Sequence, residues 1–340
     1  MRAMVLNEWG GPMTLQERPD PTPGPGEAVM KVRAAGLGLT LAHMRRGVFG
    51  GSVPRIMGHE LAGDIVAVGE GVDTLAVDDR VGVYFYLNCG YCTWCRGGRE
   101  TLCENWKGYV GVHIDGGWAE YVTLPAGNFL PLPDGLDYEA AAIAADAVCT
   151  PWHCCKERAK IQPLDNVLII GAGGGVGIHC VQMARLFGGR VIAADISEEK
   201  LNLSREWGAD HVINAKTDNI AESVMELTGG RGVQAAIDFN GAPETFEAAI
   251  ASLATSGTAV LVGGKMGEIT FPHTQLILSE QTITGTHYST RKELAESFNL
   301  MARGDIKPVV GRRVPFPELE TLFDDLANES LLGRGALTYD

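Results

Sequence analysis

Four cysteines in one short stretch are the residues whose spacing most clearly indicates chemistry. Cys89, Cys92, Cys95 and Cys103 follow the pattern C-x2-C-x2-C-x7-C. Four thiolates in one loop can fill every position around a tetrahedral zinc ion, and a site closed in this way leaves no position for a substrate. The alternative is a cluster of free thiols or disulfides, which this spacing disfavours. The sequence therefore predicts a lobe over residues 86–106 that holds a structural zinc.

A glycine-rich turn is the second feature that indicates chemistry. The sequence GAGGGVG follows the apolar run VLII and precedes a stretch with helical periodicity. Glycines let a backbone approach a pyrophosphate, whose charge then lies at the N-terminus of the helix. An ordinary turn is the alternative interpretation. The residues expected at the cofactor are Gly171, Gly173, Gly174, Gly175, Val176 and Gly177.

Asp195 supports the cofactor interpretation, because it ends the next apolar run, RVIAA. A carboxylate there can accept both ribose hydroxyls of NAD and would repel the 2′-phosphate of NADP. Lys200, one turn further on, could reach the adenosine ribose or be a solvated surface lysine. Asp195 could instead be a helix N-cap, although Ser197 could also serve as that cap. We expect NAD(H) as the cofactor.

The sequence divides into two parts of different composition, and the elements expected in each part position the residues named above. The first part is rich in glycine, proline and short β-branched runs, which predicts strands and turns. From Asn166 onward, apolar strands alternate with helices, which predicts a parallel sheet covered on both faces. The chain is then expected to return to the first domain and to end with a helix near 317–328 and a strand. The expected fold class is α/β, with a β-rich catalytic domain at 1–152 and 287–340 and a doubly wound Rossmann domain at 153–286.

Composition limits the function classes. The chain has 340 residues, 45% of them hydrophobic, and a formal net charge of −14. That charge argues against nucleic acids and anionic membranes as partners. No apolar run approaches the length of a membrane span, and the N-terminus lacks the plan of a secretory signal. With eight cysteines that suit a reducing compartment, we expect a cytoplasmic protein.

The cysteine lobe, the glycine-rich loop with Asp195 and the order of the two domains resemble the medium-chain dehydrogenases/reductases, and the zinc-containing alcohol dehydrogenases among them. The resemblance implies a GroES-like catalytic domain, redox chemistry on a small molecule, and a homodimer or homotetramer formed through the last strand of the cofactor sheet, near TITGTHY. The loop GAGGGVG is similar to those of yeast-type alcohol dehydrogenases and of quinone or enoyl reductases. It therefore does not choose between alcohol and alkene chemistry.

The positions at which this family holds a catalytic zinc are altered. Gly38 stands where the family has a cysteine ligand, and Leu41 replaces an aspartate that supports the metal. His59, in the motif Gly-His-Glu, matches the second ligand, and Asp146 aligns with the third. Glu60 could move in as a replacement ligand. A catalytic zinc needs about three protein ligands and an open position.

Two interpretations of this pocket stay open. In the first, the metal has been lost together with its thiolate ligand and the supporting aspartate. In the second, His59, Glu60 and Asp146 form a rebuilt site for zinc or another divalent ion, or Cys149 acts as a shifted ligand.

The resemblance also implies a proton relay. Thr40 matches the hydroxyl that touches the substrate oxygen, and His43 matches the histidine that passes the proton to solvent. A hydroxyl next to an imidazole of pKa near about 6.5 can carry a proton at neutral pH. A surface histidine is the alternative for His43. Thr150 matches a threonine beside the nicotinamide ring.

Three further residues are expected at the cofactor. Val262 and Gly263 lie where backbone groups of the family hold the nicotinamide carboxamide. Many members also place a basic side chain or an imidazole at the pyrophosphate, just before the relay threonine. Leu39 stands there in this chain, so Arg334 could substitute for that group.

Three functions follow as hypotheses. The first is an NAD(H)-dependent enal or enone reductase without catalytic zinc, because conjugate reduction needs only hydrogen-bond donors at the substrate oxygen. The second is an alcohol dehydrogenase on the rebuilt metal site. The third is a nucleotide-binding protein without catalysis. Trp106, Trp118 and Trp152 could line a pocket for a bulky apolar substrate, and core packing explains them equally well.

Overall fold

The computed structural model describes residues 1–265 and 267–340, which form two compact units. Unit 1 comprises Met1–Asp146 and Thr290–Asp340, and unit 2 comprises Ala147–Ser289. The first division lies several residues before the one expected from the sequence. It falls inside an unbroken helical stretch, residues 138–158, where no change in sequence periodicity marks a boundary.

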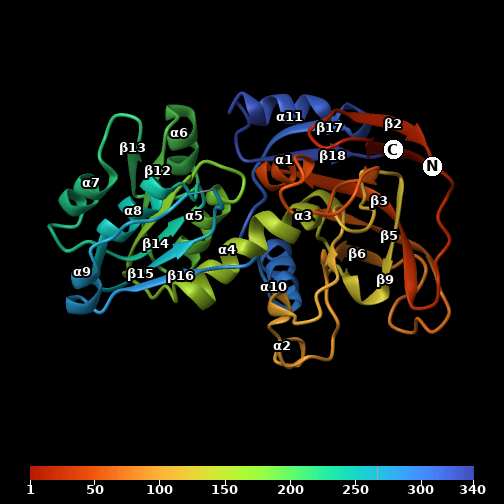
Figure 1. The fold of residues 1–340 in the computed structure, drawn as a ribbon, viewed down its shortest axis with the longest axis horizontal. Helices are drawn as coiled ribbons and strands as arrows, with labels where there is room; N and C mark the ends of the chain where they lie inside the picture. The colour runs from red at the N-terminus through yellow and green to blue at the C-terminus, as the bar shows by residue number, and fades with distance from the viewer. Residues whose placement is uncertain (266) are drawn as a thin grey trace. The chain divides into compact units, whose positions relative to one another are not determined.

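Unit 1 is built on a mixed seven-stranded sheet with the order β10-β6-β5-β3-β18-β17, and β9 also pairs with β3. Its strands are β3 (Glu27–Leu37), β5 (Leu61–Val68), β6 (Arg80–Val83), β9 (Tyr121–Pro125), β10 (Phe129–Pro131), β17 (Val310–Pro315) and β18 (Arg334–Thr338). Strand β18 runs antiparallel to β3, with Gly335 opposite Leu37. This pairing brings the end of the chain beside residues near its start (Figure 1).

Two smaller sheets and several helices complete unit 1. The sheet β2-β1-β4 consists of β1 (Arg2–Leu6), β2 (Met13–Glu17) and β4 (Arg55–Ile56), and a two-stranded sheet joins β7 (Tyr86–Leu87) to β8 (Gly108–Tyr109). The helices are α1 (Leu39–Arg45), α2 (Thr93–Arg96), α3 (Tyr138–Ile143), α10 (Arg291–Ala302) and α11 (Glu320–Ala327). Helix α10 begins with a capping box, in which Thr290 and Glu293 satisfy each other's backbone N–H groups.

Unit 2 is a parallel sheet with the strand order β13-β12-β11-β14-β15-β16. Its strands are β11 (Asn166–Ile170), β12 (Arg190–Asp195), β13 (His211–Asn214), β14 (Val233–Asp238), β15 (Leu253–Leu261) and β16 (Thr282–Gly285). Its helices are α4 (Cys149–His153), α5 (Gly177–Leu186), α6 (Glu198–Glu206), α7 (Ile220–Leu227), α8 (Pro243–Ala251) and α9 (His273–Leu278). The order reverses between β11 and β14, which is where doubly wound folds bind their ligands. The expected Rossmann sheet is confirmed.

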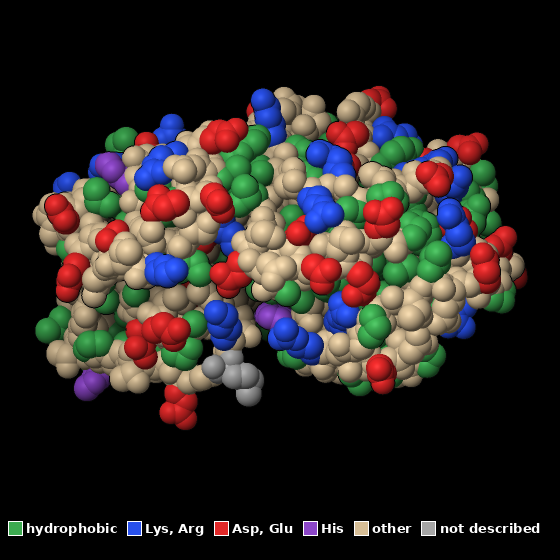
Figure 2. Space-filling model, turned by 90° about the horizontal axis from the view of Figure 1, so that it is seen from above, with side chains coloured by type: hydrophobic (Ala, Val, Ile, Leu, Met, Phe, Trp, Pro, Cys, Tyr) green, Lys and Arg blue, Asp and Glu red, His purple; other side chains and the backbone are tan. Residues whose placement is uncertain are grey.

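Charged side chains of both signs share the surface. Figure 2 shows Asp and Glu interspersed with Lys and Arg over the face that it presents. That face carries no continuous basic area of the kind that attracts nucleic acid. Among the helices of residues 1–265 and 267–340, none has both the length and the apolar character that crossing a bilayer requires.

Candidate active site

The four cysteines of the lobe converge as the spacing predicts. Their sulfur atoms all lie within 4.8 Å of one another. The Sγ atoms of Cys89 and Cys95 are 3.9 Å apart, and those of Cys92 and Cys103 are 4.0 Å apart. A tetrahedral zinc with Zn–S bonds of about 2.3 Å separates its sulfurs by about 3.8 Å, whereas a disulfide needs about 2.05 Å. The residues present fit a structural zinc.

Backbone N–H groups stabilise the thiolates that this zinc requires. Cys92 donates its N–H to Cys89 Sγ, and Cys89 donates its N–H to Cys103 Sγ, each at 3.4 Å. The N–H of Cys95 lowers the pKa of Cys92 and outweighs the opposing effect of burial. These bonds favour the charged form of Cys89 and Cys92, whereas burial raises the pKa of Cys95 to about 12.

Glu100 anchors the lobe to the start of α10, a contact that the sequence analysis missed. The buried carboxylate of Glu100 accepts a hydrogen bond of 2.6 Å from the N–H of Arg291, the first residue of that helix. The guanidinium of Arg291 also donates to Asn88, beside the first cysteine. The two partners are separated by 191 residues, so no local pattern could indicate the bond.

In unit 2 the glycine-rich turn joins β11 to α5, as expected. Asp195, at the end of β12, accepts a hydrogen bond of 3.0 Å from the N–H of Gly173. A Cβ atom on Gly173 would lie 2.8 Å from the Cα of Lys200, so this position needs glycine to let α6 pack against the loop. The second oxygen of Asp195 accepts from the N–H of Ile196, whereas the Ser197 side chain makes no capping hydrogen bond.

A buried histidine on α5 also holds the loop. His179 Nδ1 lies 2.7 Å from the carbonyl oxygen of Gly175 and donates to it in the neutral ring. Burial lowers the pKa of His179 to about 4, against the opposing effect of that carbonyl. The imidazole is therefore neutral at physiological pH. Its position one helical turn after the loop is the only sequence signal that could have pointed to this role.

Three segments of unit 1 hold the expected zinc positions, and a fourth segment adds Arg334 beside them. Gly38 lies between the end of β3 and α1. His59 and Glu60 immediately precede β5, and Asp146 belongs to a π-helical segment after α3. Arg334 is the first residue of β18.

Arg334 lies inside this pocket and bonds both carboxylates. Its Nη2 donates to Glu60 Oε1 and, at 2.8 Å, to Asp146 Oδ2, while its Nε donates to Glu60 Oε2 at 3.1 Å. The Arg334 side chain is 2% exposed, and those of Glu60 and Asp146 are 0% and 3% exposed. Burial lowers the pKa of Arg334 to about 9, so the guanidinium keeps its charge at neutral pH.

Gly38 provides the space that this guanidinium fills. A Cβ atom built on Gly38 would lie 2.8 Å from Nη2 of Arg334 and closer still to its Nη1 and Cζ. No side chain fits at position 38 while Arg334 keeps this place. The fully buried Leu41 lies on the adjoining turn of α1.

His59 has no hydrogen-bond partner in the part of the chain that the structure describes. Both ring nitrogens are buried and unbonded, and the ring packs against Phe85 with centroids 4.4 Å apart. Its Nε2 lies 3.9 Å from Glu60 Oε1 and 4.0 Å from Asp146 Oδ2, distances that are too long for hydrogen bonds. Burial lowers the pKa of His59, and the charge of Arg334 adds to that effect while Asp146 opposes it.

These residues do not fit a catalytic zinc of the family's kind. One ligand position is glycine, and the two carboxylates are already bonded to a guanidinium cation. Of these residues, His59 presents ring nitrogens that have no hydrogen-bond partner among the described residues. The three candidate ligand residues do converge, with ligand atoms within 4.8 Å of one another, but Glu60 and Asp146 already share the cation Arg334.

The expected relay residues lie on α1, and both are half-buried. Thr40 and His43 are three residues apart, so they lie on the same face of the helix. Thr150 is buried in α4 of unit 2. Val262 and Gly263 follow β15 and donate their N–H groups to the carbonyl of Asp238.

The three tryptophans differ in their surroundings. Trp118 is fully buried and packs edge-on against Phe323, which makes it a core residue. Trp152 lies against Phe187 in unit 2. Trp106 is 40% exposed and stays a candidate for contact with a substrate.

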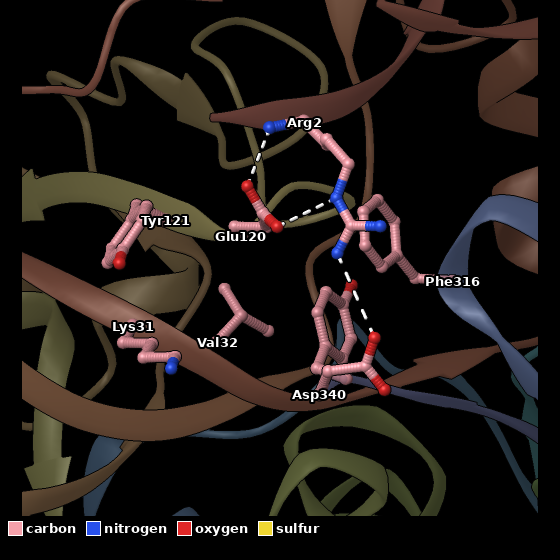
Figure 3. Close-up of a pocket in the computed structure, with 8 residues that line it drawn as sticks. Arg2, Lys31, Val32, Glu120, Tyr121, Phe316 and Asp340 are labelled. Atoms are coloured by element: carbon pink, nitrogen blue, oxygen red, sulfur yellow. Dashed lines mark hydrogen bonds and ion pairs between the residues drawn. The ribbon is translucent and has the colours of Figure 1, made fainter. Parts of the chain in front are cut away.

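A separate cavity of about 120 Å³ lies near the chain ends in unit 1 (Figure 3). None of the predicted site residues lines it. Three of its charged groups pair with one another: Arg2 bonds Glu120 at 2.8 Å and lies 3.9 Å from Asp340. The cavity is small and lies apart from the predicted site residues, so it is no candidate for the active site.

Two family models match the chain: the alcohol dehydrogenase GroES-like domain over residues 24–134, and the zinc-binding dehydrogenase domain over residues 175–303. An alcohol dehydrogenase of Geobacillus stearothermophilus is 35% identical over 343 residues, which cover 100% of both chains. The chain belongs to the zinc-containing alcohol dehydrogenase-like family of medium-chain dehydrogenases/reductases.

Further relatives support this family membership. An NAD-dependent alcohol dehydrogenase of Sulfurisphaera tokodaii is 32% identical over 348 residues, with 99% of each chain covered. A crystal structure of AibC superposes with a TM-score of 0.93 at 35% identity, covering 99% of this chain and 95% of the other. The chain is therefore an NAD-dependent oxidoreductase of this family, and its converging cysteines, Cys89, Cys92, Cys95 and Cys103, fit the structural zinc.

Proposed function

We propose that this oxidoreductase uses NADH to reduce the carbon–carbon double bond of α,β-unsaturated aldehydes or ketones, and that its pocket holds no catalytic zinc. The observation that carries the proposal is the guanidinium of Arg334, bonded to both Glu60 and Asp146 beside Gly38. Without a Lewis acid, nothing in the pocket strongly lowers the pKa of an alcohol's hydroxyl, so simple alcohols are poor substrates.

Conjugate reduction suits the side chains that remain. NADH, when bound, would supply a hydride for the β-carbon, and the negative charge that develops on the substrate oxygen would need a hydrogen-bond donor. The hydroxyl of Thr40 donates a hydrogen bond to that oxygen and stabilises the charge. His43, on the same face of α1, delivers a proton from solvent toward the substrate, whose α-carbon is finally protonated. The products are NAD⁺ and the saturated carbonyl compound.

Alcohol dehydrogenation on a rebuilt metal site is the second candidate. It is favoured by His59, whose two unbonded ring nitrogens are the kind of group that a metal ion would satisfy. Its ligands would be His59, Glu60 and Asp146, and Arg334 would have to leave both carboxylates first. Because breaking these buried ion pairs costs free energy, we place this function second.

The proposal includes the roles expected for the cofactor residues. The ribose is bound by Asp195 and Lys200, the pyrophosphate by the loop Gly171–Gly177, and the carboxamide by Val262 and Gly263. The bond from Gly173 to Asp195 supports this assignment, because it ties the loop to the ribose-binding carboxylate. Thr150 contacts the nicotinamide ring. A pyrophosphate contact for Arg334 would compete with its bonds to the two carboxylates.

We further propose a cytoplasmic homodimer or homotetramer. Strand β16 is at the end of the parallel sheet, and Ile277 and Leu278 of the neighbouring α9 are 68% and 78% exposed. Pairing of two β16 edges would bury such apolar surface. The eight cysteines of the described chain form no disulfide, which suits a reducing compartment. Sedimentation at several protein concentrations measures how many chains assemble.

One substrate series separates the two candidate functions. Trans-2-hexenal, hexanal and 1-hexanol share a carbon skeleton and differ only in the bond that reacts. We expect the enzyme to convert trans-2-hexenal to hexanal with NADH. We expect it not to oxidise 1-hexanol with NAD⁺. Formation of 2-hexenol, or turnover of 1-hexanol that a chelator abolishes, would support the alcohol dehydrogenase instead.

Thr40 variants test the proposed donor. Thr40→Val should lower kcat for the enal by about 10²-fold, the usual cost of removing one donor to a developing oxyanion. Thr40→Ser keeps the hydroxyl and is the matched control. An unchanged rate in Thr40→Val would remove Thr40 from the mechanism.

A further inference from the structure

Gly38 and Arg334 meet at the end of a strand pair. Gly335 lies opposite Leu37 in the antiparallel pairing of β18 with β3, so the preceding residue of β18 lies beside the residue that follows β3. The absence of a side chain on Gly38 leaves the volume that the Arg334 guanidinium fills. A larger side chain at position 38 would therefore need a smaller or displaced side chain at position 334.

The same two residues decide which cation the pocket can hold. A divalent ion held by His59, Glu60 and Asp146 needs oxygen atoms of both carboxylates, and those carboxylates bind Arg334 in this structure. The guanidinium is charged, buried and bonded in a fork geometry that suits carboxylates. A metal ion and Arg334 therefore compete for the same partners.

We propose that the guanidinium of Arg334 is a covalently attached cation that takes the place of a metal ion in this pocket. The missing side chain of Gly38 leaves the space for it. Replacing both residues together therefore creates a divalent metal site. This inference rests on the metal-free pocket of the proposed function and explains how its buried carboxylates are balanced. Gly38→Cys alone adds a ligand but collides with Arg334. Arg334→Ala alone removes the competing cation but leaves the family's thiolate position empty.

Cobalt binding tests the exchange directly. Wild type, Gly38→Cys, Arg334→Ala and the double variant are prepared with the cysteine lobe filled by zinc and then given Co²⁺ alone. Cobalt and zinc per chain are measured after gel filtration, together with the near-ultraviolet absorption of a cobalt–thiolate bond. The double variant Gly38→Ser with Arg334→Ala is the control for that absorption, because it supplies no thiolate.

We expect the Gly38→Cys, Arg334→Ala double variant to bind one cobalt per chain beyond its lobe zinc, with thiolate absorption, and the wild type to bind none. Two results would overturn the inference. One is cobalt uptake by the wild type equal to that of the double variant. The other is a double variant that retains its lobe zinc and binds NADH but takes up no cobalt. Conversion of trans-2-hexenal to hexanal by the same wild-type sample separates these failures from failure of the proposed function.

A stability cycle covers the case in which the double variant does not fold. Gly38→Ala should lower the melting temperature of the wild type clearly, because the new methyl group displaces Arg334 from both carboxylates. In the Arg334→Ala background, the same change should lower it by much less. Equal shifts in the two backgrounds would show that the residues are not coupled, and would also overturn the inference.

Discussion

Replacement of Arg334 by methionine probes the central contact of the pocket. The side chains of Arg334, Glu60 and Asp146 are at most 3% exposed, so Arg334→Met leaves two buried carboxylates without their cation. Removing one partner of a buried ion pair costs about 3–5 kcal/mol, because the remaining charge is neither solvated nor paired. We therefore expect the free energy of unfolding to fall by about that amount.

Arg313→Met is the matched control. Arg313 also bonds a carboxylate through two nitrogens, with both distances to Glu139 at 2.7 Å, but its side chain is 55% exposed. Exposed ion pairs contribute about 0–1 kcal/mol, since water solvates the charges when the pair is broken. Both variants are compared with wild type by urea denaturation, with NADH present at the same concentration.

A double-mutant cycle with Glu60→Gln completes this test. Because Glu60 and Arg334 are in direct contact, the double variant should lose clearly less stability than the sum of the single losses. The reasoning would be refuted if Arg334→Met cost no more than Arg313→Met, or if the losses in the cycle were additive.

Three further predictions concern other parts of the molecule. Asp195→Asn removes the charge that repels a 2′-phosphate, so the preference in kcat/KM for NADH over NADPH should fall by about tenfold or more, equivalent to at least about 1.4 kcal/mol; an unchanged ratio would contradict the role of Asp195. His179 has its pKa lowered to about 4 by burial. The unfolded chain therefore binds a proton that the folded chain excludes, and stability should fall as the pH drops from about 6.5 toward 4, by about 2 kcal/mol at pH 5. His179→Gln should lose less stability between pH 7 and pH 5 than wild type, and equal losses would refute this. Cys103→Ser removes one of four zinc ligands, so zinc per chain and the melting temperature should both fall, and retention of the lobe zinc would argue against the assignment.

Local features of the sequence were sufficient for much of the fold. The cysteine spacing predicts the lobe because all four ligands come from one loop, so their convergence depends on few backbone angles. The parallel sheet follows from short apolar runs alternating with helices, and the glycine-rich turn is next to the strand that positions it. In such cases the contacts that matter are close along the chain.

The contacts of Arg334 were beyond sequence reasoning. The arginine is 274 residues from Glu60 and 188 residues from Asp146, and a pairing of two strands brings it there. From the sequence, Arg334 was expected at the pyrophosphate, and Gly38 was only a missing ligand. The structure links the two positions, because the volume released by one residue is filled by the other.

Zinc per chain in freshly purified wild-type protein, measured by elemental mass spectrometry without chelators, shows whether a metal ion is present beside His59, Glu60 and Asp146. We expect one zinc per chain, held by the four cysteines of the lobe, because Arg334 already bonds Glu60 and Asp146 in the other cluster of candidate ligands. Two zinc ions per chain, with the second lost in His59→Ala, would contradict the metal-free pocket and move alcohol dehydrogenation to first place.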